Sequence, residues 1–148
     1  MDVRIRRLGP GDETLLAQRA IENADFDLDG RSGPVKPLAD DAASAYLANP
    51  NVLHWVAEKS GRVVGDLHCY ALQKRAGEPM EVLLYEIGVR QNCRREGIGA
   101  SLVRSLLEWM SRHGVKEAWV LADNPGAVEF YKACGFKVGS PAPTYLIT

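Results

Sequence analysis

Alternating hydrophobic and polar positions predict β-strands in the first half of the chain. Residues 3–8 alternate valine and isoleucine with arginine, which predicts a half-buried strand. Apolar residues dominate segments 52–58 and 62–72, which flank the dipeptide Ser60-Gly61. Two such segments joined by a short turn with glycine are typical of a β-hairpin.

Residues 80–89 are apolar on both faces of an extended chain, which predicts a strand in the centre of a sheet. Strict alternation assigns Val82, Leu84 and Gly88 to one face and Leu83, Tyr85, Ile87 and Val89 to the other. Glu86 is the exception, because a carboxylate in a central strand is unfavourable unless it has a partner or a function. We therefore treat Glu86 as a candidate functional residue.

Hydrophobic residues spaced three and four positions apart predict the helices. The predicted helices cover residues 12–23 with Asp12 as N-cap, 42–47 after a cap at Asp40 or Asp41, 97–112 and 127–134. Further strands are predicted at 119–121, 136–138 and 145–147. The order β-α-α-β-β-β-α-β-α-β-β predicts an α/β fold. We expect a single domain over residues 1–148, with a mixed, mostly antiparallel central sheet flanked by helices.

The composition is that of an ordinary soluble globular protein. The chain has 148 residues, a net charge of -1 at pH 7 and 46% hydrophobic residues, which suits one domain with a hydrophobic core. A nucleic-acid-binding protein is usually more basic, and no apolar segment is long enough to span a membrane. We therefore expect no nucleic-acid or membrane partner and a cytoplasmic location. The three cysteines are far apart in the sequence, so we expect neither a disulfide framework nor a metal site.

Basic residues and glycines follow the 80–89 strand and open the longest predicted helix. Backbone N–H groups in the first turn of a helix lack partners and carry partial positive charge, and glycine lets an anion approach them. Arg94 and Arg95 add full charges that suit phosphate. The loop has neither the Gly-x-Gly-x-x-Gly of dinucleotide-binding folds nor the Gly-Lys-Ser/Thr of P-loops. It therefore predicts a pyrophosphate site of another kind.

The spacing of this loop resembles that of a known family. Arg94-x-x-Gly97-x-Gly99 begins five residues after Val89, and the pattern resembles the coenzyme A loop of the GNAT N-acetyltransferase superfamily. The predicted order of helices and strands also coincides with the topology of that superfamily. The resemblance implies that the loop holds the pyrophosphate of acetyl-CoA through backbone N–H groups.

A second motif, Asn124-x-x-Ala127-x-x-Phe130-Tyr131, lies downstream and also resembles the superfamily pattern. The resemblance implies acetyl-CoA as the cofactor, with its pantetheine arm between the main chain of residues 87–89 and the helix around Ala127. The residues that it implies in cofactor binding are Ile87, Gly88, Val89, Arg94, Arg95, Glu96, Gly97, Ile98, Gly99, Ala100, Asn124, Ala127 and Tyr131.

Two residues are candidates for proton transfer. Tyr131 matches the family tyrosine that gives a proton to the departing thiolate, and general acid catalysis of this kind is worth about 10² to 10⁴ in rate. The alternative is a tyrosine that only packs against coenzyme A. Glu86 is the candidate base for the amine, directly or through water, since burial raises the pKa of a carboxylate toward a useful value. The alternative for Glu86 is a buried carboxylate paired with an arginine.

The acceptor amine is indicated less directly. Segments 7–10, 84–89 and 94–98 resemble the aminoglycoside 3-N-acetyltransferases, which carry an acidic residue at the position of Glu86. The resemblance implies a polycationic small-molecule amine as substrate, and it allows a homodimer. The implied substrate-binding residues are Glu22, Asp25, Asp27, Asp29 and Glu86.

Other interpretations of the acceptor side stay open. An acidic loop is often simply solvated, and the chain end at residues 145–148 supplies no carboxylate. The remaining functions are a peptide or protein N-terminal acetyltransferase and a non-catalytic acyl-CoA-binding module.

Overall fold

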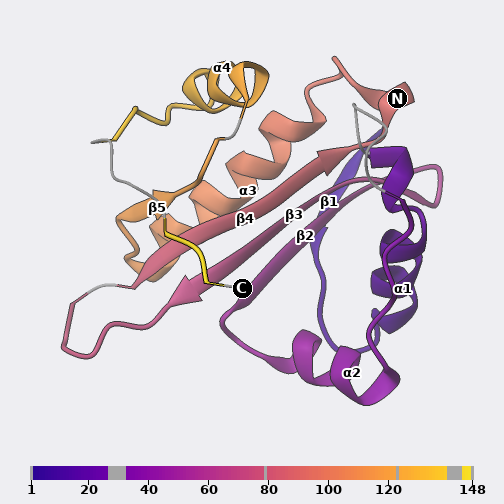
Figure 1. Ribbon diagram of the computed structural model, residues 1–148, viewed down its shortest axis with the longest axis horizontal. Helices are drawn as coiled ribbons and strands as arrows, with labels where there is room; N and C mark the ends of the chain where they lie inside the picture. The colour runs from indigo at the N-terminus through magenta and orange to yellow at the C-terminus, as the bar shows by residue number, and fades with distance from the viewer. Residues whose placement is uncertain (1, 27–32, 79, 123, 140–144, 148) are drawn as a thin grey trace.

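Five strands form one mixed sheet in the order β1-β2-β3-β4-β5 (Figure 1). The computed structural model describes residues 2–26, 33–78, 80–122, 124–139 and 145–147. The strands are β1 (Arg4–Arg7), β2 (Val52–Lys59), β3 (Arg62–Leu72), β4 (Glu81–Val89) and β5 (Glu117–Trp119). Neighbouring strands are antiparallel except for β4 and β5, which are parallel. The predicted mixed, mostly antiparallel sheet is therefore confirmed.

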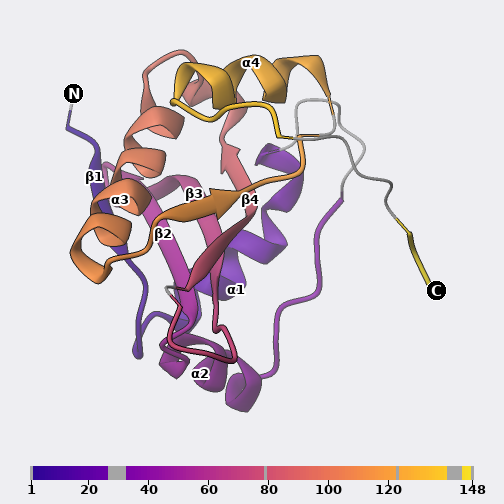
Figure 2. The same ribbon diagram turned by 90° about the vertical axis from the view of Figure 1, so that its left-hand side faces the viewer.

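Helices cover both faces of this sheet (Figures 1 and 2). The described helices are α1 (Glu13–Ile21), η1 (Asn23–Phe26), α2 (Asp40–Ala48), η2 (Gln91–Cys93), α3 (Ile98–His113) and α4 (Pro125–Ala133). The larger hydrophobic core lies between the sheet and α3, where Leu102 and Leu106 are fully buried. A smaller cluster on the other face includes Leu47 of α2 and Phe26 of η1. The buried apolar stripe of α3 is the one that the periodicity predicts.

Of the two N-terminal helices, only the second starts differently from the prediction. Asp12 is the N-cap residue of α1 as predicted, but its side chain makes no capping hydrogen bond, because its carboxylate accepts hydrogen bonds from Arg6 and the Gly9 N–H instead. The second helix begins at Asp40, with Ala39 in the N-cap position. Asp40 and Asp41 therefore lie in the first turn, where negative charge still complements the helix dipole.

The strands predicted at 136–138 and 145–147 are wrong. Neither segment forms a strand, although both lie within the described part of the chain. Val138 is 77% exposed and Ile147 is 101% exposed. A β-branched or aromatic residue favours a strand only where neighbouring strands pack against it, and these side chains have no such support.

A β-bulge in β4 interrupts the pairing with β3. Cys69 is opposite Leu84, whereas the preceding residue His68 is opposite Glu86. Tyr85 is therefore an extra residue with no direct partner on β3. Such a bulge changes the face to which the following side chains point.

The bulge corrects the predicted faces of β4. Leu84 is buried in the core under α3, and Ile87 packs against the same core although strict alternation places it on the opposite face. Tyr85 and Glu86 both lie on the α1 side, since Tyr85 contacts the ring of His68 and Glu86 contacts Arg19 of α1. Two consecutive side chains of β4 thus project from the same face.

The outer edge of β4 is only partly covered by β5. The two strands pair at Glu81, Val82 and Leu83, which are the first three residues of β4 (Figure 1). From Leu84 to Val89 this edge has no strand partner among the residues that the structure describes. Main-chain N–H and C=O groups along the edge of a strand can pair with an added extended chain.

Candidate active site

The loop between β4 and α3 has the backbone of an anion site. Arg95 has φ +66° and Gly97 has φ +79°, so both are left-handed. Gly97 is the N-cap of α3, and no side chain caps this helix. A Cβ at Gly97 would meet nothing within 4 Å. The first turn of α3 therefore presents the N–H groups of Ile98, Gly99 and Ala100, and the helix dipole favours an anion beside them.

The charged residues of this loop differ in their contacts and in their exposure. Arg94 donates from Nε to the Val89 carbonyl at 3.0 Å and from a terminal nitrogen to the Phe26 carbonyl at 2.8 Å. It thereby joins the end of β4 to η1, a structural contact that the sequence does not indicate. Glu96 pairs with Lys59 of β2 at 2.8 Å. Arg95 is the exposed arginine of the pair, so its charge is the more accessible to a phosphate.

Gly99 allows α3 and α4 to approach closely. A Cβ on Gly99 would lie 3.0 Å and 3.1 Å from two ring atoms of Phe130 and 3.9 Å from Ile87. The end of β4, the start of α3 and α4 therefore meet at this glycine. The contact brings together the residues of the two sequence motifs.

Asn124 is the N-cap of α4. Its side-chain oxygen accepts a hydrogen bond from the Ala127 N–H at 2.8 Å, and Pro125 occupies the first turn. Both features are typical of helix N-termini. Asn124 thus fixes the start of the helix that carries Tyr131.

Tyr131 is 8% exposed and belongs to the core cluster under the sheet. Its ring packs edge-on against Phe130 at 5.2 Å and Phe136 at 5.5 Å between centroids. Ile87 and Val89 of β4 pack against the same cluster. The tyrosine is therefore held rigidly on the α3 side of the sheet, next to the strand with the open edge.

Glu86 lies on the opposite face, and its predicted burial is wrong. Its side chain is 54% exposed, and Oε1 is 3.3 Å from a terminal nitrogen of Arg19. The bulge explains the difference, because it moves Glu86 from the core face, where strict alternation places it, to the α1 side of the sheet. A carboxylate in this position can meet a molecule from solvent.

The predicted acidic acceptor residues are partly neutralised by Arg90, which is 4% exposed. Arg90 pairs with Glu22 at 2.6 Å and with Asp25 at 3.1 Å, and its Nε donates to the Val63 carbonyl at 2.7 Å. The hydrogen bond from Arg90 holds the pKa of Glu22 below its usual value. The other two predicted acidic residues, Asp27 and Asp29, lie outside the described residues.

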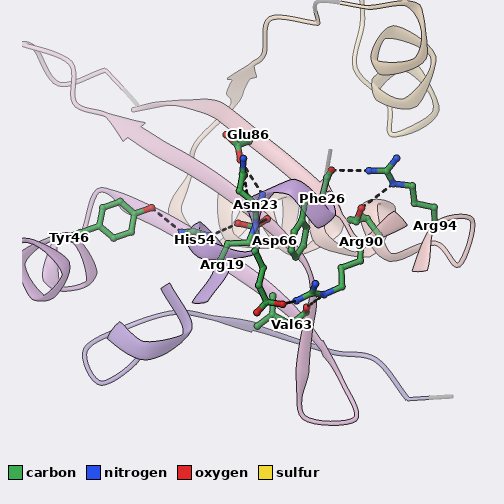
Figure 3. Close-up of polar contacts among 12 residues, drawn as sticks. Arg19, Asn23, Phe26, Tyr46, His54, Val63, Asp66, Glu86, Arg90 and Arg94 are labelled. Carbon is green, nitrogen blue, oxygen red and sulfur yellow. Dashed lines mark hydrogen bonds and ion pairs between the residues drawn. The ribbon is translucent and has the colours of Figure 1, made fainter. Parts of the chain in front are cut away.

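A chain of hydrogen-bonded, mostly buried polar residues, which the sequence did not indicate, extends from the protein interior to Glu86 (Figure 3). Arg19, whose side chain is 9% exposed, donates from Nε to Asp66 at 2.8 Å. The second oxygen of Asp66 is 2.9 Å from His54 Nε2, and His54 Nδ1 is 2.9 Å from the Tyr46 hydroxyl. The chain therefore connects α1, β3, β2 and α2.

Burial and hydrogen bonding set the charges within this chain. Burial acts to raise the pKa of Asp66, but the hydrogen bond from His54 and the charge of Arg19 outweigh it and hold that pKa below its usual value. Burial raises the pKa of Tyr46, so the phenol stays protonated and can donate. Because the Asp66 carboxylate can only accept, His54 Nε2 carries the proton of their hydrogen bond, and His54 Nδ1 is hydrogen-bonded to the Tyr46 hydroxyl.

Aromatic rings surround this end of the sheet beside Glu86. His68 lies 4.7 Å from Tyr70 and 5.3 Å from Tyr85 between ring centroids. Burial and the neighbouring His54 lower the pKa of His68 to about 4, so it is neutral at pH 7. Tyr85 is 62% exposed. An open aromatic surface therefore stands next to an exposed carboxylate.

Other kinds of site are not evident in the described structure. Within the described ranges, no group of three or more His, Cys, Asp or Glu side chains could hold a metal ion. None of the described helices combines the length and hydrophobicity needed to cross a membrane.

The chain belongs to the acetyltransferase (GNAT) family, whose model matches residues 18–136. Probable N-acetyltransferase camello of Xenopus laevis is 30% identical over 110 residues, which are 72% of this chain and 49% of that protein. N-alpha-acetyltransferase RimI of Mycobacterium tuberculosis is 36% identical over 103 residues, which are 68% of this chain and 62% of RimI. The chain thus spans about half the length of the first of these relatives.

The fold is also similar to a solved aminoglycoside acetyltransferase from an uncultured soil metagenomic sample, in complex with trehalose. The TM-score is 0.84 over 99% of this chain and 95% of that chain, with 22% sequence identity. At this identity the likeness concerns the fold alone. The family and the fold that the two motifs indicated are therefore confirmed. Enzymes of this family use acetyl-CoA as the acetyl donor.

Proposed function

We propose that this domain transfers the acetyl group of acetyl-CoA to a primary amine while both molecules are bound. One observation carries the proposal. The open edge of β4 begins at the bulge that projects Glu86, and near its end Ile87 lies beside Gly99 in the first turn of α3, a helix with no side-chain cap. Three features therefore lie along β4: an open edge that can pair with an extended amide chain, a helix N-terminus that favours an anion, and an exposed carboxylate.

The residues fit acetyl-CoA on the evidence of the backbone. The left-handed residues Arg95 and Gly97 and the first turn of α3 suit a pyrophosphate. The main chain at 87–89 suits the pantetheine amides, with Ala127 and Asn124 at the start of α4 on the far side. When bound, acetyl-CoA would supply the thioester carbon that the amine attacks.

Proton transfer falls to two side chains on opposite faces of the sheet. Glu86 removes the proton that an ammonium must lose before the nitrogen can attack, directly or through one water. Tyr131 donates its phenolic proton to the departing sulfur. The exposure of Glu86 supports access to a soluble amine, and the aromatic contacts of Tyr131 support a fixed donor.

The acceptor that we propose is an aminoglycoside, acetylated at the 3-N position, or a similar polycationic small molecule. Glu86 offers a negative charge to one amine, and the exposed ring of Tyr85 offers a flat surface to a sugar. The likeness in fold to an aminoglycoside acetyltransferase also favours this acceptor. Because Arg90 compensates Glu22 and Asp25, the negative charge for further amines depends on other residues.

The second candidate is the N-terminal amine of a peptide or protein. The 36% identity to RimI, an N-alpha-acetyltransferase, favours it. An extended peptide needs a groove rather than a flat aromatic surface. A homodimer is compatible with either candidate.

A thiol-release assay with acetyl-CoA tests the proposal. The panel contains kanamycin- and gentamicin-like aminoglycosides, linear polyamines and peptides with free N-termini. We expect release of coenzyme A with aminoglycosides, and a loss of about a hundredfold in kcat for Glu86→Gln. Glu58→Gln, which removes the ion pair between Glu58 of β2 and Arg6 of β1, is the matched control. Activity on peptides alone would replace the acceptor, and binding of acetyl-CoA without turnover on any amine would leave only an acyl-CoA-binding module.

A further inference from the structure

Arg19 is the most completely fixed polar side chain beside Glu86. Its Nε donates to Asp66 at 2.8 Å, one terminal nitrogen donates to Asn23 at 2.8 Å, and the other is 3.3 Å from Glu86. Its guanidinium also lies 3.9 Å from the centroid of the Phe26 ring. Each nitrogen therefore has a partner (Figure 3), and the central carbon of the guanidinium lies over an aromatic face. A guanidinium held in this way has one orientation.

The partners of Arg19 differ sharply in exposure. Asp66 lies inside the protein with 6% of its side chain exposed, whereas Glu86 has 54% exposed. Arg19 thus reaches from a buried anion to an anion at the surface. A buried ion pair is a poor source of stability, because desolvation of both charges opposes their attraction. The pairing of Arg19 with Asp66 is therefore better explained by a function than by its contribution to stability.

We propose that Arg19 is a positioning residue for Glu86, and that Asp66 and His54 hold Arg19 in place. This inference rests on the proposed function, because it requires Glu86 to act on the acceptor amine. It adds three residues that neither sequence motif contains, and they come from α1, β3 and β2.

The hydrogen bonds explain how the positioning works. Glu86 has three side-chain torsions and is largely exposed, so without a partner its carboxylate samples many orientations. Arg19 binds Oε1, which leaves Oε2 to accept a proton from the amine. Displacement of a reacting group by about 1 Å can lower a rate about a hundredfold.

The same contacts explain the role of Asp66 and His54. Asp66 accepts from Arg19 with one oxygen and from His54 with the other, so its carboxylate cannot rotate. His54 is itself fixed, since its second ring nitrogen is bonded to Tyr46. Three elements of the fold therefore determine where the terminal nitrogen of Arg19 points.

A double-mutant cycle on turnover tests the inference. The proteins are the wild type, Arg19→Gln, Glu86→Gln and the double variant, with KM and kcat measured for acetyl-CoA and the best amine. We expect Glu86→Gln to lower kcat about a hundredfold and Arg19→Gln to lower it at least tenfold. The double variant should match Glu86→Gln within about twofold, because a positioning residue has nothing to position once Glu86 is gone. The KM for acetyl-CoA should stay within about twofold of the wild type in all four.

The outcomes separate the inference from the proposed function. If Arg19→Gln lowers kcat by the same factor with and without Glu86, its effect is independent of Glu86 and the inference is wrong. An Arg19→Gln variant with the same kcat as the wild type would also refute the inference. Wild-type turnover of Glu86→Gln would refute the proposed base and the inference with it.

Two further variants keep the test decisive if Arg19→Gln does not fold. Arg19→Lys keeps the charge but loses the planar fork, and it enters the same cycle with the same expectation. His54→Gln loosens the chain three contacts away from Glu86, and its smaller loss of kcat should also vanish in the Glu86→Gln background. Glu58→Gln, which breaks an ion pair elsewhere on the sheet, should leave kcat unchanged.

Discussion

Replacing Asp66 by asparagine tests whether its charge stabilises the folded protein at neutral pH. Asparagine preserves the shape of the side chain but removes the negative charge that faces Arg19 at 2.8 Å. Arg19, with 9% of its side chain exposed, then keeps only the mostly exposed Glu86 as an anionic partner among the contacts of the described residues. Breaking a buried pair by removing one partner costs about 3 to 5 kcal/mol.

We expect Asp66→Asn to lower the free energy of unfolding by about 3 kcal/mol, the low end of that range, because the amide can still hydrogen-bond. For a domain of this size, 1 kcal/mol corresponds to about 2 to 4 °C in Tm, so Tm should fall by about 6 to 12 °C. Glu58→Gln is the control, since its partly exposed ion pair should be worth less than about 1 kcal/mol.

The pH dependence gives a second check. The folded protein holds the pKa of Asp66 below its usual 3.8, so the carboxylate contributes stability above pH 3.8 and loses it as the pH falls through the folded pKa. The difference between wild type and Asp66→Asn should therefore be constant from pH 7 to about pH 4 and shrink below that. Urea unfolding followed by circular dichroism measures it. Equal stability at pH 7, or a difference that grows on acidification, would refute the reasoning.

Three further changes test the site. Gly99→Ala forces a Cβ to within 3.0 Å of Phe130. We therefore expect the free energy of unfolding to fall by about 1 to 3 kcal/mol and calorimetry to show weaker acetyl-CoA binding. Gly77→Ala is the unstrained control, because a Cβ there meets nothing within 4 Å. Tyr131→Phe should lower kcat about a hundredfold while the Kd for acetyl-CoA stays within a few-fold, and unchanged turnover would remove the proton-donor role. Tyr85→Leu should raise the KM for an aminoglycoside about threefold to tenfold, whereas Tyr85→Phe should not, and equal effects on a linear polyamine would contradict stacking.

Local signals in the sequence predicted much of the fold. Ser60 and Gly61 form the predicted tight turn, and both have positive φ. The apolar stripe of α3 is also as predicted, and the helix ends at the left-handed Gly114. These features depend on residues a few positions apart. The sequence carries such information directly.

The parts that could not be predicted depend on contacts between distant segments. The bulge at Tyr85 is a property of how β4 pairs with β3, and alternation along β4 alone gives the wrong faces after Leu84. Arg19 and Asp66 are 47 positions apart. The sequence nevertheless indicates that Arg19 faces the protein interior. Arg19 lies one turn from Leu15 and Leu16, on the helix face that packs against the smaller core.

The candidate site was predicted as a set of positions rather than as an arrangement. The position of the loop before α3 follows from its basic residues and glycines, whereas the left-handed backbone of Arg95 does not. The exposure of Glu86 does not, since it results from the bulge. The involvement of Arg94 with the Phe26 carbonyl also needed the fold, because η1 and the loop meet only in three dimensions.

The short pairing of β5 has a consequence for how the protein is handled. From Leu84 to Val89, an edge without a strand partner among the described residues is a template on which the strands of other molecules can assemble. A ligand that lies along this edge would protect the same groups from aggregation. Because we propose that the pantetheine arm of acetyl-CoA lies along this edge, a preparation stripped of cofactor should precipitate sooner on storage than one kept with acetyl-CoA.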